Sequence, residues 1–529
     1  MDRFNISEGA NPNFLATICK VGELFPIEGA DKLAKAVING YDIVVPKTLK
    51  EDDVVVYFPV ESSICEGYLS ANNLFEFSEA DRNSNFEEIK MLIDTMDSTE
   101  DSEMKKTYYA QAKSMCGFFN KYGRVRMIKL RGQYSMGFVA TIETLIKFMP
   151  DLKDIDWELM VGTQFNYIND IEICKKYVPV VKPSKHGNNG HDRAWKKRTK
   201  HLKRFDRIRE DQFAFHYSTK MFAEHFKEFS PEDDINISLK VHGTSIIMAN
   251  ILCNRKLNMW EKIKKFFGFK VKEVEYGNVY SSRSVIKNQY INPNADSYYK
   301  VDVWGEVNKI FSPYIEDGFT IYGEVVGYLP GSDKMIQKSY DYGCEPGKWK
   351  FMPYRITYTD EIGNKTEFEI YEVDEWTRNL VTDNPHLAEY TMFLTNFYSG
   401  PFKDLYSDID TEHHWHENVL ARMKTDKNFL MEELEPLCKN KVPREGIVIR
   451  KNGDDFARAW KLKCTKFYER EAKANDAGEV DMEEMESQTT NAWDEYLKDN
   501  VVLATDGHGM PTAVMPRDLY NEMQKRNKK

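Results

Sequence analysis

One lysine within an apolar stretch is the first candidate for covalent chemistry. Residues 236–248 read Asn-Ile-Ser-Leu-Lys-Val-His-Gly-Thr-Ser-Ile-Ile-Met, which places Lys240 at the end of a β-rich run, shortly before Gly243. Glycine permits a close approach of backbone to a ligand. A lysine amine becomes a nucleophile when its ammonium is desolvated or lies beside other cations. The spacing alone is weak evidence, because a surface lysine before a turn has the same pattern.

Further stretches carry residues whose types suit a bound phosphate or metal ion. Arg283 follows a strand-like run, and its planar guanidinium can bind phosphate through two hydrogen bonds. Glu324 interrupts a second apolar run, and Glu445 stands at the head of a third. A carboxylate in such a place needs a partner or a metal ion. The run Phe351-Met-Pro-Tyr354-Arg-Ile is an aromatic strand.

Lys461 and Lys463 stand two residues apart in the run Ala-Trp-Lys-Leu-Lys. On a strand, both side chains project to one face. Two ammonium groups on one face repel each other unless an anion lies between them. The pair therefore predicts a bound phosphate, and its positive field would help Lys240 to lose its proton.

The elements that must position these residues are short strands mixed with helices, which favours an α+β fold. Regular short strands after residue 14, with Asn39-Gly40 as a hairpin turn, predict a small N-terminal β-barrel. Beyond residue 210, helices and strands lack strict βαβ alternation, which favours antiparallel sheets. The predicted organisation is a barrel-like domain at 1–180 with a helical insertion near 67–120, a basic linker at 181–209, a catalytic domain at 210–468 and a polar C-terminal tail at 469–529.

The composition indicates a globular chain from a reducing compartment. Of the 529 residues, 41% are hydrophobic and 13% aromatic, which is enough for real cores and argues against a disordered chain. The eight cysteines are scattered singly, which favours free thiols and a cytoplasmic location. No apolar stretch approaches the roughly 20 residues of a membrane span, so we expect no membrane partner.

Positive charge is concentrated in two segments, although the chain has a net charge of −11. Residues 182–209 hold eleven Lys/Arg and two Asp, a local sum of +9. Residues 255–272 hold seven basic residues and one Glu, together with Trp260 and three phenylalanines. A solvated linker or helix face is the simpler interpretation, and a surface that follows phosphates is the alternative. For the aromatic residues of 255–272 we expect packing against the core, with an RNA-stacking insertion as the alternative.

In this order, the six stretches resemble the motifs of the covalent nucleotidyltransferases, which include RNA ligases, DNA ligases and mRNA capping enzymes. Lys-Val-His-Gly-Thr, with Lys240 as its first residue, is similar to the nucleophile motif of phage-type RNA ligases. Residues 129–137, Lys-Leu-Arg-Gly-Gln-Tyr-Ser-Met-Gly, resemble the OB-fold domain that precedes the ligase domain in a small family of nick-sealing RNA ligases. The resemblance covers roughly residues 12–66 and 121–468.

The resemblance implies a role for each matching residue. Lys240 would be the adenylylated nucleophile, and Lys461 and Lys463 would contact the α-phosphate. Arg283 would bind the adenylate or the RNA 5′-phosphate, and Glu324 would bind the ribose and support the metal. Tyr354 would stack on adenine, with Phe351 beside it. Glu445 would help to hold the divalent metal. Phage-type ligases often have Glu before the nucleophile, to read the adenine amine. Here Leu239 stands there, so backbone groups or another side chain must select ATP over GTP.

The implied fold is an OB-like β-barrel followed by a nucleotidyltransferase domain of ATP-grasp-like, antiparallel-sheet type. The implied activity is that of an ATP-dependent RNA ligase with Mg²⁺ or Mn²⁺. It would seal 5′-phosphate and 3′-hydroxyl ends of RNA, at nicks in RNA-containing duplexes, through a lysyl-AMP intermediate. The alternatives are a DNA ligase or capping guanylyltransferase, whose OB domain follows the catalytic domain, and a non-enzymatic RNA-binding protein.

Overall fold

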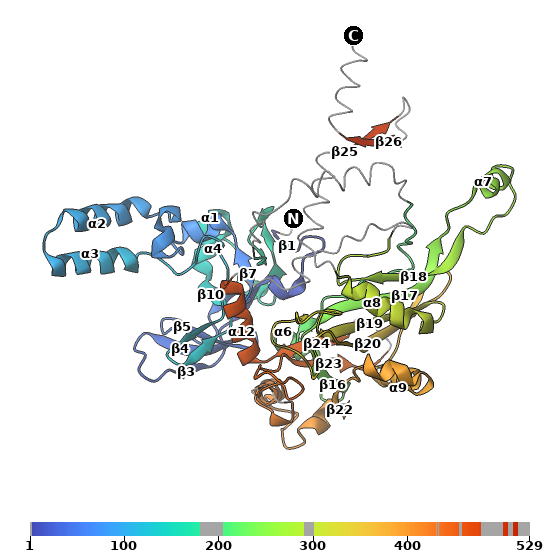
Figure 1. Cartoon of the computed structure of the whole chain (residues 1–529). Coiled ribbons are helices and arrows are strands. Elements are labelled where there is room, and N and C mark those ends of the chain that lie inside the picture. The colour runs from blue at the N-terminus through green and yellow to red at the C-terminus, as the bar shows by residue number, and fades with distance from the viewer. Residues whose placement is uncertain are drawn as a thin grey trace, which may run out of the picture.

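The computed structural model describes residues 3–179, 205–289, 301–429, 431, 433–453, 458–477, 501–505 and 511–516. Two projections leave the body of the molecule at opposite ends (Figure 1). One is the helix pair α2 (Phe86–Ser98) and α3 (Ser102–Ser114), which lies in the segment predicted as a helical insertion. The other is a strand hairpin that carries α7 (Met259–Phe266). Most of the predicted basic linker at 181–209 lies outside the described residues.

Within the described residues, the C-terminal half contains two five-stranded sheets. The first has the order β15 (Lys220–Met221), β24 (Ala459–Lys463), β23 (Gly446–Lys451), β16 (Asp234–Lys240) and β22 (Asn396–Pro401). The second has the order β18 (Val274–Ser281), β17 (Thr244–Asn254), β19 (Phe319–Gly327), β20 (Trp349–Thr359) and β21 (Lys365–Glu367). β15 runs parallel to β24, and the remaining pairs are antiparallel. The predicted α+β class with antiparallel sheets is confirmed.

Helices cover the faces of these sheets and so fix their orientation. α8 (Val303–Phe311) and α9 (Ile370–Asp383) share an apolar core with β17, β19 and β20. The first sheet shares a larger core with α6 (Phe222–His225), α10 (Phe402–Leu405) and α11 (Trp415–Met423). A separate antiparallel pair joins β25 (Val501–Thr505) and β26 (Pro511–Pro516).

The N-terminal part consists of short antiparallel strands with two helices beside them. One sheet has the order β10 (Phe138–Thr141), β6 (Val54–Phe58), β2 (Ala16–Lys20) and β11 (Gln164–Phe165), and another the order β3 (Leu24–Pro26), β4 (Leu33–Ile38) and β5 (Tyr41–Pro46). Shorter groups are β1 (Phe4–Asn5) with β12 (Tyr167–Ile168) and β13 (Ile171–Glu172), β7 (Ser62–Ile64) with β14 (Cys174–Lys176), and β8 (Ile128–Leu130) with β9 (Gln133–Ser135). α1 (Glu66–Ala71) and α4 (Ile142–Phe148) contribute to its second core.

The turn between β4 and β5 shows how a local signal fixes a register. Asn39 and Gly40 both have positive φ, 50° and 80°, as a two-residue turn of type I′ requires. Ile38 therefore pairs with Tyr41, and every second residue of β4 is buried. The predicted Asn39-Gly40 hairpin is confirmed.

α12 (Thr465–Asp476) joins the N-terminal part to the first sheet of the C-terminal half. The Arg124 side chain is only 3% exposed and pairs with Glu61 at 2.7 Å and with Asp476 of α12 at 2.8 Å. Breaking a buried charged pair of this kind leaves an uncompensated charge, so the contact holds the helix in place. The predicted start of the polar tail, residue 469, lies inside this helix.

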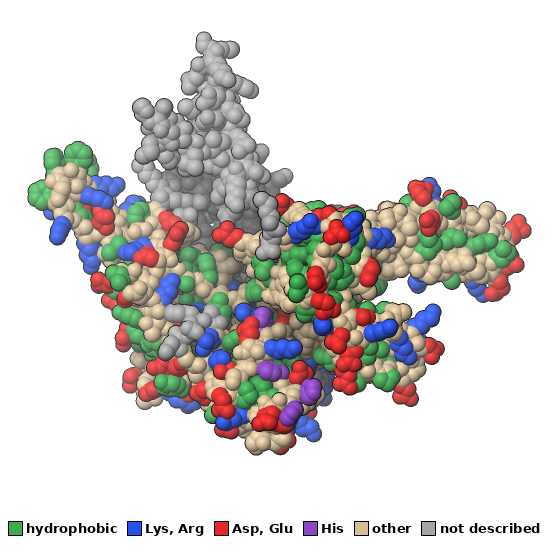
Figure 2. Space-filling model, turned by 180° about the vertical axis from the view of Figure 1, so that it is seen from behind, with side chains coloured by type: hydrophobic (Ala, Val, Ile, Leu, Met, Phe, Trp, Pro, Cys, Tyr) green, Lys and Arg blue, Asp and Glu red, His purple; other side chains and the backbone are tan. Residues whose placement is uncertain are grey.

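The α7 projection differs from the sequence-based expectation. Trp260 and Phe266 are 75% and 85% exposed, and Phe267 and Phe269 are exposed as well. The expected packing of these aromatic residues against the core is therefore wrong. The reason is that the hairpin of β17 and β18 extends beyond the body of the molecule, as the space-filling view in Figure 2 also shows.

Candidate active site

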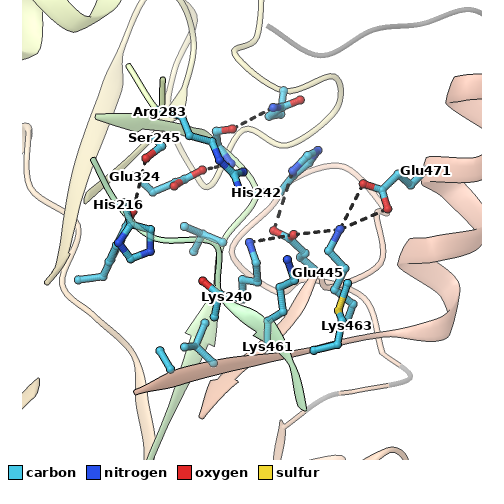
Figure 3. Close-up of a pocket in the computed structure, with 18 of the residues that line it drawn as sticks. His216, Lys240, His242, Ser245, Arg283, Glu324, Glu445, Lys461, Lys463 and Glu471 are labelled. Atoms are coloured by element: carbon cyan, nitrogen blue, oxygen red, sulfur yellow. Dashed lines mark hydrogen bonds and ion pairs between the residues drawn. The ribbon is translucent and has the colours of Figure 1, made fainter. Parts of the chain in front are cut away.

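A single pocket collects the predicted charged residues from segments that are far apart in the sequence. Lys240 ends β16, Glu324 lies on β19, and Glu445 immediately precedes β23. The residues that line this pocket include Lys240, Arg283, Glu324, Glu445, Lys461 and Lys463 (Figure 3). Tyr354 also lines it. Lys461 and Lys463 are both on β24 and both reach the pocket, as alternation along a strand requires.

The turn after Lys240 is shaped by close backbone packing. A Cβ atom at Gly243 would collide with the carbonyl oxygen of Val325 and the side chain of Glu324, so glycine is needed there. The Gly243 amide donates a hydrogen bond to Glu324 Oε1 at 3.2 Å. The Gly243 carbonyl accepts one from Gln337 at 2.9 Å. The loop that presents the Lys240 amine is thus fixed from both sides.

Glu445 is the central anion of the pocket. Its Oε1 lies 2.9 Å from the Lys240 Nζ and 3.8 Å from the Lys463 Nζ. Burial would raise the pKa of Glu445, but Lys240, Lys463 and His242 outweigh this effect and lower its pKa to about 2. Its Oε2 is buried and has no hydrogen-bond partner among the described residues. Glu445 therefore has a free acceptor position that a ligand could fill.

The two lysines of β24 have different surroundings. Lys463 lies 3.2 Å from Glu471 of α12, and although burial would lower its pKa, Glu471 and Glu445 raise it above the usual value. Lys461 is in no ion pair within the described part of the chain. Burial lowers the pKa of Lys461 well below its usual value, and the charges of Lys463, Arg283 and Lys240 lower it further. An anion such as phosphate bound beside Lys461 would favour its protonated form.

Arg283 and Glu324 lie next to each other on the opposite side of the pocket from Lys461 (Figure 3). Glu324 is on β19, beside the Lys240 loop, because Ser245 of β17 pairs with Glu324 in the sheet register. Arg283 follows β18, the other neighbour of β17. The sheet thus brings a guanidinium and a carboxylate to the rim of the same pocket.

An aromatic wall borders the pocket near Tyr354. The Tyr354 hydroxyl lies 3.4 Å from the Ser245 hydroxyl, and its ring contacts the His216 ring edge-on with centroids 5.3 Å apart. His216 Nδ1 is buried without a hydrogen-bond partner in the described structure. Burial, together with the charges of Arg355 and other cations, lowers the pKa of His216 well below its usual value, so its imidazole is neutral.

Phe351 is the one predicted site residue that the structure places away from the pocket lining. Its side chain is fully buried in the apolar core beneath the second sheet and contacts the Phe311 ring of α8 at 5.0 Å. Residues that alternate along a strand face opposite sides of the sheet. The pairing of β20 with β19 changes register between Tyr322 and Gly323 of β19. Tyr354 of β20 lines the pocket, whereas Phe351 of the same strand does not.

Several residues that line the pocket were not predicted from the sequence. Glu471 lies in the segment predicted as a polar tail, yet it pairs with Lys463. His216 and Arg450 also line the pocket, and Arg450 donates to the Ser238 hydroxyl at 2.7 Å. The N-terminal part contributes a further set, namely Asn11, Phe14, Val60, Glu61, Lys176 and Tyr177. The helical spacing of Phe467, Tyr468 and Ala472 was the signal that could have extended the catalytic domain beyond residue 468.

The carboxylates of the pocket suit a divalent cation only if a substrate supplies further ligands. Among the described residues, no group of three or more His, Cys, Asp or Glu could hold a metal ion. Mg²⁺ is commonly bound by one or two carboxylates together with substrate phosphates and waters. The free Oε2 of Glu445, with Glu324 in the same pocket, suits that shared mode of binding.

The chain is similar to some solved structures, but at low sequence identity. No family model matches the chain, and no curated protein matches it either. Among solved structures, a variant of Naegleria gruberi RNA ligase with ATP and Mn is 15% identical over 86% of this chain and 98% of its own, with a TM-score of 0.47. The same ligase with PPi is 15% identical over 87% and 98%, with a TM-score of 0.46. Both solved structures are of this RNA ligase.

Proposed function

We propose that the chain is an ATP-dependent RNA ligase that joins 5′-phosphate and 3′-hydroxyl ends through a lysyl-AMP intermediate. The observation that supports this most is the pocket itself. The Lys240 and Lys461 amines and the carboxylates of Glu445 and Glu324 line one space, and Lys240 lies 2.9 Å from Glu445. A nucleophilic amine among cations is what attack on a phosphate requires, because negative charge develops on the phosphate oxygens.

In the first transfer, the Lys240 amine attacks the α-phosphorus of ATP, a phosphorus–nitrogen bond forms, and pyrophosphate leaves. Lys461 and Lys463 would face the α-phosphate oxygens and stabilise the charge that grows on them. The amine must first lose its proton. Glu445, with a pKa near 2, is a poor base for this proton. Its ion pair with Lys240 must therefore weaken when the triphosphate arrives, so that the ammonium can lose its proton.

The remaining pocket residues are proposed to bind the nucleotide and the RNA end. Tyr354 would stack on the adenine base and Glu324 would contact the ribose, with Arg283 on the adenylate or the RNA 5′-phosphate. Phe351 would support Tyr354 from within the core. A divalent cation, Mg²⁺ or Mn²⁺, would neutralise phosphate charge when bound, with Glu445 and Glu324 as its protein ligands.

The second and third transfers need a nucleic-acid site next to the same pocket. The RNA 5′-phosphate would take the AMP from Lys240, and a 3′-hydroxyl would then attack that phosphate and release AMP. We propose that the N-terminal part is an OB-like barrel, residues 1–180, that holds the RNA duplex around the nick. Lys176 and Tyr177, which line the pocket from that side, support this placement. The catalytic domain would extend from about residue 210 to the end of α12.

A cytoplasmic location is proposed on the state of the thiols. All eight cysteines lie within the described ranges, and none of them forms a disulfide there. Free thiols persist in a reducing compartment such as the cytoplasm.

The test is covalent labelling by ATP or GTP whose α-phosphate is labelled, followed by a denaturing gel. ATP should label the wild type and GTP should not. Labelling by GTP would indicate a capping guanylyltransferase, and the absence of any label would indicate a binding protein. Lys240→Ala should remove the label, yet still seal a pre-adenylylated 5′ end. Comparing sealing of nicked RNA and nicked DNA duplexes then separates an RNA ligase from a DNA ligase.

A further inference from the structure

The α7 projection has an apolar stripe that nothing in the described structure covers. Met259, Trp260, Ile263, Phe266 and Phe267 recur at the spacing of one helix face, and four of these five side chains are 69% or more exposed. Soluble proteins rarely leave a contiguous patch of this kind open without a partner. The stripe lies at the outer end of the projection, with Lys and Arg side chains next to it (Figure 2).

The helix is built to keep its shape in solution. Asn258 and Glu261 form a capping box at its start, with hydrogen bonds of 2.9 and 2.8 Å. At its end Gly268 has a φ of 80°, and the amide of Phe269 bonds to the carbonyl of Lys264 at 3.0 Å, which closes the helix. Arg255 bonds to the carbonyl of Lys272 across the base of the hairpin at 2.9 Å. The apolar face is therefore presented ready-formed, and little ordering entropy opposes its burial.

The charge around the stripe is strongly positive. Residues 255–272 hold seven basic residues and one Glu, a local sum of +6 within a chain of net charge −11. Arg255 pairs with Glu261, and Lys265 pairs with Glu273. The other lysines of the segment have no carboxylate partner within the described chain; they are Lys256, Lys262, Lys264, Lys270 and Lys272. The surface that complements this tip must be apolar at its centre and anionic around it.

From these features we propose that the α7 tip docks on the surface of an anionic lipid bilayer. A short helix with Trp and Phe on one face and lysines beside them lies in the interface of such a bilayer, with the rings in the acyl boundary and the ammonium groups at the headgroups. The docking is peripheral. Among the described residues, no helix has the length and apolar character needed to cross a membrane. This partner differs from the sequence-based expectation of a chain without membrane contact.

Two other occupants fit the tip less well. Unpaired RNA bases stack on aromatic rings, but Met259 and Ile263 belong to the same stripe and offer no ring. A second copy of the tip would bring two sets of unpaired lysines together, and their repulsion opposes the contact. An anionic bilayer can bury the aliphatic side chains and the rings and can also bind the lysines through its headgroups.

The test is co-sedimentation of the full-length protein with phosphatidylcholine vesicles, with and without phosphatidylserine. Binding should require phosphatidylserine and weaken as salt is added. The double variant Trp260→Ser/Phe266→Ser should bind about tenfold more weakly or worse, since two large apolar groups are lost. Lys262→Glu/Lys264→Glu should weaken binding by a similar order of magnitude.

Matched controls lie elsewhere on the surface. Leu159→Ser/Ile362→Ser removes two side chains that are 82% and 79% exposed, and Lys90→Glu/Lys105→Glu reverses two exposed charges. Both controls should bind vesicles like the wild type, and thermal unfolding should show all variants to be folded. Equal vesicle binding by the wild type and the tip variants, or none by either, would overturn the proposal. So would tip variants that lose single-stranded RNA affinity or change the oligomeric state while vesicle binding stays the same.

Discussion

The pocket and the α7 tip are both rich in lysines and aromatic rings, yet they are organised in opposite ways. In the pocket, Lys240 and Lys463 meet Glu445 and Glu471, which arrive from distant segments of the chain. At the tip, most lysines have no carboxylate partner among the described residues, and the rings are exposed. The comparison shows that local composition does not define a lysine's use. Partly buried lysines held by distant carboxylates suit the proposed chemistry on one phosphate, while exposed lysines around an apolar stripe suit a broad surface.

Removing the two lysines of β24 should have the strongest effect on the pocket. Lys461→Met and Lys463→Met should each slow lysyl-AMP formation by about a hundredfold, because one counter-charge to the α-phosphate is lost. Single-turnover adenylylation measures the effect. Lys451→Met is the matched control: this lysine ends the neighbouring strand β23 and pairs with Asp233, outside the pocket. Equal rates for all three variants would mean that the β24 lysines do not face the phosphate.

Glu471 tests whether α12 belongs to the pocket. Glu471→Gln should slow adenylylation by roughly tenfold, because Lys463 loses the partner that positions its ammonium group. Glu469→Gln is the control on the same helix, since Glu469 pairs with Lys473 and bonds to Tyr134 instead. If both variants keep the wild-type rate, the helix has only a structural role.

The pocket residues differ in how far their positions could be predicted from the sequence. The joint projection of Lys461 and Lys463 follows from the period of two along a strand, and the Asn39-Gly40 turn depends on two adjacent residues. Glu471 could not be paired with Lys463 from the sequence, because the contact depends on how α12 packs after β24.

The aromatic residues also show that the sequence does not predict which contacts a side chain makes in the fold. Phe351 and Trp260 are both in aromatic stretches, but the first is buried in the core and the second is exposed at the tip of the projection. Local pattern predicts that a helix such as α7 has an apolar face. It does not predict whether that face meets the rest of the chain, because this depends on where the hairpin of β17 and β18 points.

His242, in the loop after Lys240, should make the free energy of unfolding depend on pH. Burial lowers the pKa of His242 to about 4, against an ordinary value of 6.5. Its folded-state pKa is depressed, so the stabilisation is present above about pH 6.5 and is lost as the pH falls toward 4. Over that window the wild type should lose at most about 3 kcal/mol through this group.

Denaturant unfolding at pH 7 and pH 5 measures this dependence. His242→Gln should flatten it, whereas His386→Gln, at an exposed histidine, should leave it as in the wild type. A pH dependence that is the same in all three proteins would show that His242 takes up its proton as readily folded as unfolded.

The smallest expected effect is that of the tip on the pocket. Trp260→Ser/Phe266→Ser should leave the rate of lysyl-AMP formation within about twofold of the wild type, because the tip is at the far end of an 11-residue strand from the Lys240 loop. An extended strand rises about 3.3 Å per residue, which separates the two regions by roughly 30 Å. A large loss of adenylylation would join the two regions into one functional unit and contradict the comparison.

The central claim is that Lys240 becomes covalently linked to AMP. The most direct measurement is mass spectrometry of the protein after incubation with ATP and a divalent cation, intact and then after proteolysis. We expect the mass of one AMP on the intact protein, carried by the peptide that contains Lys240 and absent from Lys240→Ala. An adenylate on another residue, or no adenylate in a protein that nevertheless seals RNA nicks, would contradict it.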